Sequence, residues 1–165
     1  HWRRVGAPAA TDFDSTQLIP DRFFIVHHPT SVTQATTYKV NAHDDIYKFN
    51  VRLLTCSTSR QETPVGLLRP VDLELNDLNL GGTPAFMTSL SMLISGRRDE
   101  LLMYDNAAAG FNKGPSARYF YFDGKWLKQG AGNADHGGDV IPAGWGFVIR
   151  KYSGTGASVN WTLPE

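Results

Sequence analysis

The sequence predicts an all-β protein in which two related β units, sandwich-like or barrel-like, share one core. Most apolar segments are short and rich in β-branched and aromatic residues, and Gly, Pro, Asn or Asp separates them. Frequent turns of this kind are typical of sandwiches and barrels. Apolar residues do not recur with a long helical period, so we expect at most one short helix, within segment 86–95.

Strands are predicted where polar and apolar residues alternate or where aromatic residues gather. Segments 45–53 and 71–75 alternate with a period of two, as strands with one buried face do. Asp123-Gly124 predicts a type I′ hairpin turn between two further strands. Segment 153–157 contains glycines but lacks the Lys and the helix of a phosphate-binding loop, so we interpret it as a hairpin turn. The other predicted strands are 99–104, 118–122, 125–128 and 160–163.

One module occurs twice along the chain. Each copy runs from a Trp through an Asp-containing loop and an Ile-Pro pair to an apolar stretch closed by two basic-type residues. The matching features are Trp2 and Trp126, Asp12 with Asp14 and Asp135 with Asp139, Ile19-Pro20 and Ile141-Pro142, and segments 23–28 and 145–151. We therefore divide the chain into a first, incomplete copy (1–44), a connecting β region (45–98) and a second, complete copy (99–165).

The first copy lacks the strand that precedes the hairpin turn in the second copy. It begins at His1, the position that corresponds to Lys125. We expect either that the native protein extends further towards its N-terminus or that another subunit supplies the missing strand, and we favour the first. A first residue other than Met is consistent with processing or with a fragment.

Charge and composition disfavour several classes of function. Lys and Arg together number 16, as do Asp and Glu, so the formal net charge is zero, and no basic stripe is present to neutralise nucleic-acid phosphates or anionic lipids. Segment 85–94 is apolar but too short and too polar to span a bilayer. Cys56 is the single cysteine, which excludes an internal disulfide and a Cys-based zinc site.

Two groups of residues are candidates for metal binding. His1 could chelate copper through its amine and ring nitrogen, with His28 (or His27 or His43) as second ligand, as in lytic polysaccharide monooxygenases. The alternative is that His1 is merely where the chain begins, which the repeat favours. Asp135 and Asp139 offer oxygen ligands for calcium, although Asp is also a common turn residue.

Aromatic side chains are candidates for contacts with a partner or a glycan. Trp2, Trp126 and Trp145 could stack on sugars, but cross-strand packing is the more common role of rings in sheets. Neither a Gly-x-Ser-x-Gly elbow nor a Walker loop nor an HExxH motif occurs. The acidic pair Asp99-Glu100 is adjacent on a predicted strand, where its side chains diverge, which does not favour a glycosidase pair.

The second copy carries a family resemblance. Its closing segment 141–151 reads Ile-Pro-Ala-Gly-Trp-Gly-Phe-Val-Ile-Arg-Lys, and with segments 99–106, 110–113, 119–121 and 124–126 it resembles an uncharacterised family of exported proteins found mainly in Verrucomicrobia-type bacteria. The likeness covers the chain well from about Val71 onwards and more loosely before it; in the first copy, His27-His28 stands in place of Arg150-Lys151. The resemblance implies export and β structure, but no activity.

These observations favour a non-enzymatic structural or adhesive protein, secreted or at the cell surface. Because the first copy is incomplete and net charge is zero, we expect self-assembly through an open strand edge. The expected partners are other copies or cell-surface components, without nucleic acid, membrane span or required cofactor. Two alternatives stay open: a copper-dependent polysaccharide oxidase that uses His1, and a carbohydrate-binding module that uses exposed rings.

Overall fold

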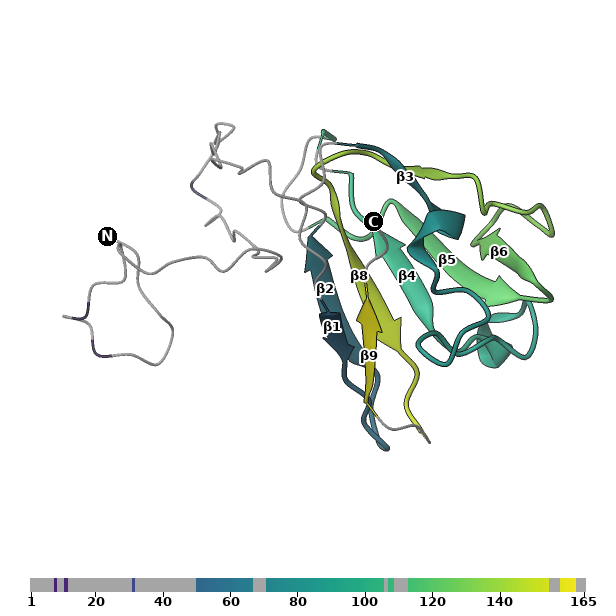
Figure 1. Cartoon of the computed structure of the whole chain (residues 1–165), viewed down its shortest axis with the longest axis horizontal. Helices are drawn as coiled ribbons and strands as arrows, with labels where there is room; N and C mark the ends of the chain where they lie inside the picture. Colours follow the sequence, from purple (N-terminus) through teal and green to yellow (C-terminus); the bar gives the residue numbers. More distant parts are fainter. Residues whose placement is uncertain are drawn as a thin grey trace.

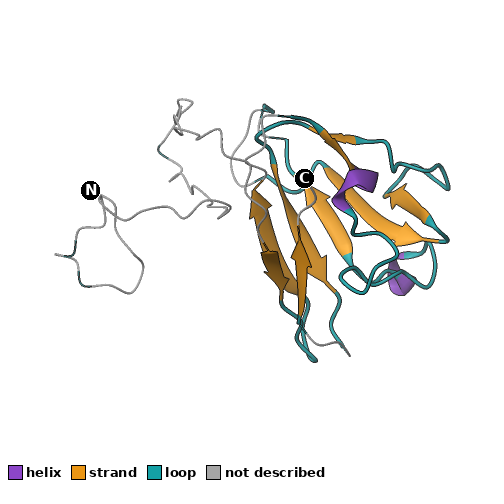
Figure 2. Cartoon of the chain, viewed as in Figure 1, coloured by secondary structure: helices purple, strands orange, loops and turns teal. Residues whose placement is uncertain are grey.

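The computed structural model describes residues 50–66, 71–105, 107–108, 113–154 and 158–162, together with the single positions 8, 11 and 31. These residues form strands and two short 3-10 helices, and the all-β prediction is confirmed (Figure 2). The strands are β1 (Asn50–Leu53), β2 (Gln61–Gly66), β3 (Leu73–Glu74), β4 (Glu100–Met103), β5 (Ala117–Phe122), β6 (Lys125–Lys128), β7 (Val140–Ile141), β8 (Gly146–Lys151) and β9 (Val159–Thr162).

The helices are η1 (Leu75–Leu78) and η2 (Ile94–Gly96). Both are single turns, and η2 begins inside the segment for which the sequence allowed a short helix. Among the described residues, no helix has the length and apolar character needed to cross a bilayer.

The strands form three antiparallel sheets (Figure 1). The largest has the order β2-β8-β4-β5-β6, and two small sheets pair β1 with β9 and β3 with β7. Strands β1 and β2 come from the predicted connecting region, yet they pair with β9 and β8 of the predicted second copy. The described residues between 50 and 162 therefore share sheets across that predicted boundary, while of the first copy the structure describes only positions 8, 11 and 31.

The loop after β8 corrects one sequence prediction. Segment 153–157 was expected to be a hairpin turn, but β8 pairs with β2 and β4 whereas β9 pairs with β1. The loop thus carries the chain from one sheet to another. Consecutive strands can separate in this way because the hydrogen-bonding partners come from the other end of the described chain, where β1 and β2 lie.

The core lies between the five-stranded sheet and the two small sheets. Side chains alternate along β8, so Phe147 and Ile149 face this core, and the Phe147 ring lies 6.3 Å from the Trp161 ring of β9. Trp161 also donates a hydrogen bond from Nε1 to the carbonyl of Leu78 at 2.9 Å. Figure 1 shows the β1–β9 pair next to β2 and β8, as these contacts require.

The turn between β5 and β6 has the predicted type. Asp123 and Gly124 have φ angles of 51° and 74°, and a type I′ turn requires positive φ at both central residues. The flanking residues Phe122 and Lys125 face each other in register. The prediction of a type I′ hairpin here is confirmed.

The outer strands of the large sheet are protected against further pairing. In β2, Pro64 removes one backbone donor, and proline in a sheet is tolerated at such edges. At the other edge, the Trp126 carbonyl of β6 already accepts a hydrogen bond from the His136 amide at 2.7 Å. The open edge predicted for the first copy lies outside the described residues and stays a prediction.

Candidate functional site

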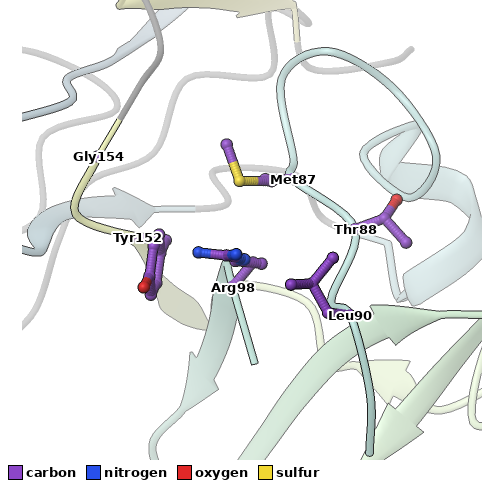
Figure 3. Close-up of a pocket in the computed structure, with 6 residues that line it drawn as sticks. All are labelled: Met87, Thr88, Leu90, Arg98, Tyr152 and Gly154. Atoms are coloured by element: carbon purple, nitrogen blue, oxygen red, sulfur yellow. The ribbon is translucent and has the colours of Figure 1, made fainter. Parts of the chain in front are cut away.

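A small pocket opens where β8 ends and β4 begins. Its volume is about 330 Å³. Three separate segments line it: the loop after Phe86, the residue two positions before β4, and the residues that follow β8. The lining side chains are Met87, Thr88, Leu90, Arg98, Tyr152 and Gly154 (Figure 3).

The buried carboxylate of Asp99 holds two walls of this pocket in place. It accepts a hydrogen bond from the backbone N–H of Met87 at 2.6 Å and another from the backbone N–H of Tyr152 at 2.7 Å. One side chain therefore ties the loop that carries Met87 to the segment that follows β8. Carboxylates that accept backbone N–H groups form strong, directional hydrogen bonds, so both walls have a defined position.

Lys151 neutralises this buried carboxylate. Its ammonium group forms an ion pair with Asp99 and also donates a hydrogen bond to the Ala85 carbonyl at 2.7 Å. The two side chains are 4% and 1% exposed. Burying such a pair costs solvation energy, and good hydrogen-bonding geometry offsets that cost. The pair specifies how the loop closes over the end of the sheet.

Arg98 lies beside the ion pair but takes no part in it. Its guanidinium carbon lies 4.2 Å from the centre of the Tyr152 ring, and Figure 3 shows the side chain between Tyr152 and Leu90, below Met87. Within the described residues, the guanidinium makes no hydrogen bond and no ion pair, and neither do the hydroxyl groups of Thr88 and Tyr152. The pocket thus combines unpaired polar groups with apolar walls, a combination that is typical of ligand sites.

An exposed apolar ridge, defined as Leu90, Leu93 and Ile94, adjoins the pocket. These side chains are 68%, 71% and 71% exposed. The turn that carries them is held by its own backbone, because the Leu90 amide donates to the Gly96 carbonyl at 2.8 Å and the Gly96 amide donates to the Leu93 carbonyl at 2.9 Å. At Gly96, a Cβ atom would lie 2.1 Å from the hydroxyl oxygen of Ser91, so the turn is closely packed.

A second polar cluster surrounds Asp139, the residue that precedes β7. Its carboxylate accepts hydrogen bonds from the Tyr119 hydroxyl at 2.7 Å and from Lys128 at 3.2 Å, and it lies 3.1 Å from Nδ1 of His136. Burial, and then the hydrogen bond to Asp139, raise the pKa of Tyr119. Burial alone would raise the pKa of Asp139, but the hydrogen bonds from Tyr119, His136 and Lys128 lower it below its usual value.

The loop that contains this cluster holds both predicted calcium residues, and calcium binding there stays a prediction. The Asp139 carboxylate is occupied by cationic and hydrogen-donating partners, and Asp135 accepts a hydrogen bond from the backbone N–H of Gly137 at 2.9 Å. Both residues thus serve the conformation of the loop between β6 and β7. Within the described residues, no group of three His, Cys, Asp or Glu side chains is placed to hold a metal ion.

The aromatic residues predicted to contact a partner or a glycan differ in burial. Trp126 is only 1% exposed, and its ring packs against Phe86 at 5.1 Å and Tyr121 at 5.5 Å. It cannot offer a ring face to a glycan or a partner, so this candidate is corrected to a core residue. Trp145 is partly buried against the same core. Trp2 lies outside the described residues.

The copper prediction also lies outside the described residues, because His1 and His28 both do. The sequence reasoning missed the pocket: it did not single out Arg98, Tyr152 or Lys151 as site residues. Local patterns gave no signal for these residues, because the pocket depends on the pairing of β4 with β8, which are far apart in the sequence. Comparison of the chain with models of known families, with curated proteins and with solved structures gives no match.

Proposed function

We propose that this chain is a non-enzymatic association protein, structural or adhesive, whose copies contact one another through the apolar ridge. One observation carries the proposal: Leu90, Leu93 and Ile94 expose about 70% of their side chains on a single turn. Isolated exposed apolar residues are common, but a group of them on one surface is typical of an interaction site. Location outside the cell stays the expectation that the family resemblance implies.

The ridge has the mechanical properties of a contact surface. Its turn is closed by backbone hydrogen bonds, and the Ser89 amide at its base donates to the Tyr121 carbonyl of β5 at 2.8 Å. A rigid turn loses little conformational entropy when a partner covers it. The entropic cost of ordering the loop therefore offsets little of the free energy gained when its apolar side chains are buried.

Electrostatics favours a second copy as the occupant. Segment 90–96 contains no charged residue, and the whole chain has zero formal net charge. Two copies can therefore approach without long-range repulsion, and the same uncharged surface can face itself across a two-fold axis. A ridge of three side chains provides only part of the roughly 800 Å² per partner of a standard interface, so we expect weak, concentration-dependent association.

The polar clusters in the described residues support a non-catalytic role. The Asp99–Lys151 pair anchors a loop, and Asp139 anchors the loop between β6 and β7. The hydrogen bonds of each cluster are made to other groups of the fold. Among the described residues, the ridge gathers the three most exposed large apolar side chains on one turn.

Sedimentation velocity over a range of concentrations tests the proposal. The wild-type sedimentation coefficient should rise with concentration, and the double variant Leu93→Asp/Ile94→Asp should stay monomeric because carboxylates would have to be buried. Leu54→Asp is the matched control, since Leu54 is 50% exposed but lies in the loop after β1. A wild-type chain that is monomeric at every soluble concentration, or a ridge variant that associates like the wild type, contradicts the proposal.

A further inference from the structure

We propose that the pocket beside the ridge binds a carboxylate carried on a short apolar group, with the Arg98 guanidinium as its anchor. The inference goes beyond the association proposed above and does not depend on it. Leu90 belongs to both surfaces, but Leu93 and Ile94 do not line the pocket and Arg98 is not part of the ridge. The two proposals can therefore fail separately.

Arg98 has no anionic partner within the described residues. By contrast, Arg150 of β8 is paired with Glu62 and Glu100, and Arg60, which precedes β2, is paired with Glu100. Within the described residues, the Arg98 guanidinium has only the Tyr152 ring, and the pocket wall leaves its N–H groups available. A guanidinium held against an aromatic face is positioned at little further entropic cost for an anion that enters the pocket.

The nearest acidic side chain does not compete for Arg98. Asp99 follows it in sequence but is turned inwards, where it pairs with Lys151 and accepts the backbone N–H groups of Met87 and Tyr152. Its acceptor oxygens are thus already used. The only positive charge that faces the pocket among its lining residues remains without compensation.

The single positive charge of Arg98 indicates a ligand with a single negative charge. One guanidinium matches one carboxylate, which it can bind through two parallel N–H···O bonds. A phosphate group carries more charge and is usually held by several donors, but the Lys151 ammonium is committed to Asp99. Thr88 and Tyr152 also line the pocket, and their hydroxyl groups have no partners in the described residues.

The rest of the ligand must be small and apolar. Met87 and Leu90 form apolar walls, and the volume of about 330 Å³ lies at the lower end of the range for ligand pockets. A group the size of one amino-acid side chain fits these limits. The C-terminal residue of a peptide and a short-chain organic acid share this chemistry.

Asp99 makes the site rigid before the ligand arrives. By holding the amides of Met87 and Tyr152, it fixes one apolar wall and the ring on which Arg98 rests. The Arg98 amide itself donates to the Ser89 hydroxyl oxygen at 3.2 Å. When the walls of a site are held in this way, binding of a small ligand does not carry the entropic cost of ordering those walls.

Two-dimensional NMR titration of the full chain with N-acetyl-leucine tests the proposal. N-acetyl-leucinamide is the matched neutral ligand, and a tetrapeptide with C-terminal leucine and hexanoate separate the two sources of the carboxylate. We expect saturable shifts of the Met87, Leu90 and Tyr152 amides with N-acetyl-leucine, and at least tenfold weaker binding of the amide. Binding of either the peptide or hexanoate supports the shared chemistry, and the better binder identifies the source.

Variants locate the site. Arg98→Gln should weaken binding of N-acetyl-leucine at least tenfold. Arg52→Gln, at an exposed position of β1, should leave it unchanged. Equal binding of the acid and the amide, wild-type affinity in Arg98→Gln, or an absence of saturable shifts at these amides overturns the proposal. Because Arg98 is half-buried and outside the core, the unchanged spectrum of the variant away from the pocket verifies that it folds.

Discussion

Asp99 and Lys151 form an ion pair that is almost wholly removed from water, with side chains 1% and 4% exposed. Besides the ion pair itself, the Asp99 carboxylate accepts hydrogen bonds from two backbone amides, and the Lys151 ammonium group donates one to the Ala85 carbonyl. A pair of this kind stabilises the folded state little more than apolar residues in its place would, but removal of either partner alone strongly destabilises the fold. Its value here is to bring two segments distant in sequence to one pocket.

Lys151→Met should therefore destabilise the fold by about 3 to 5 kcal/mol, because the Asp99 carboxylate stays buried without a counter-charge. Urea unfolding followed by circular dichroism measures this change. Lys125→Met, at a half-exposed position of β6, is the control and should change the unfolding free energy by less than about 0.5 kcal/mol. A cost below about 1 kcal/mol for Lys151→Met would show that the pair is solvated.

The turn between β5 and β6 supports a second prediction. Gly124 has a φ of 74° and no atom within 4 Å of a hypothetical Cβ, so an alanine would meet backbone strain but no clash. Gly124→Ala should cost about 1 to 2 kcal/mol, the penalty of the left-handed conformation. Gly66→Ala, which also has open space and lacks a positive φ, should have little effect in the same denaturation experiment. Similar costs for the two variants would contradict this explanation.

Local sequence signals predicted the local structure well. Asp123-Gly124 specified its turn type because only a few residues adopt positive φ. The divergence of Asp99 and Glu100 is likewise confirmed, since Asp99 pairs with Lys151 on one face of the sheet and Glu100 pairs with Arg150 on the other. Both features depend only on backbone geometry within a few residues.

Features that depend on pairing between distant strands were not predictable in the same way. The pocket requires that β4 and β8 are neighbours in a particular register, with Glu100 opposite Arg150, and an alternating pattern does not specify which strands pair. The burial of Trp126 has the same origin, because its contacts with Phe86 come from a loop forty residues earlier in the chain. Ring composition alone is equally compatible with binding and with packing.

The cluster around Asp139 predicts a pH-dependent contribution to stability. Its lowered pKa means that the ionised carboxylate stabilises the folded state at pH values above its ordinary pKa of 3.8, and that this contribution is lost as the pH falls through the folded-state pKa. Asp139→Asn should therefore cost about 1 to 2 kcal/mol at pH 7, and the difference from the wild type should shrink below pH 4.

Urea titrations at several pH values measure this difference. Tyr119→Phe removes the shortest hydrogen bond of the cluster and should reduce the same pH dependence without abolishing it. An Asp139→Asn cost that is as large at pH 3 as at pH 7 would mean that the carboxylate charge has no part in it.

The last prediction concerns the thiol of Cys56, in the loop between β1 and β2. Hydrogen bonds from the side chain of Ser59 and then from Thr58, whose hydroxyl lies 3.4 Å from the sulfur, lower the pKa of Cys56 from 9.0 to about 6. Since the thiolate is the reactive form, alkylation by iodoacetamide should reach half its maximal rate near pH 6. Ser59→Ala should move this midpoint upwards, and Ser57→Ala, which removes a neighbouring hydroxyl that does not contribute, should leave it in place. A wild-type midpoint near the value of about 8.5 for an unperturbed cysteine would show that these hydrogen bonds do not stabilise the thiolate.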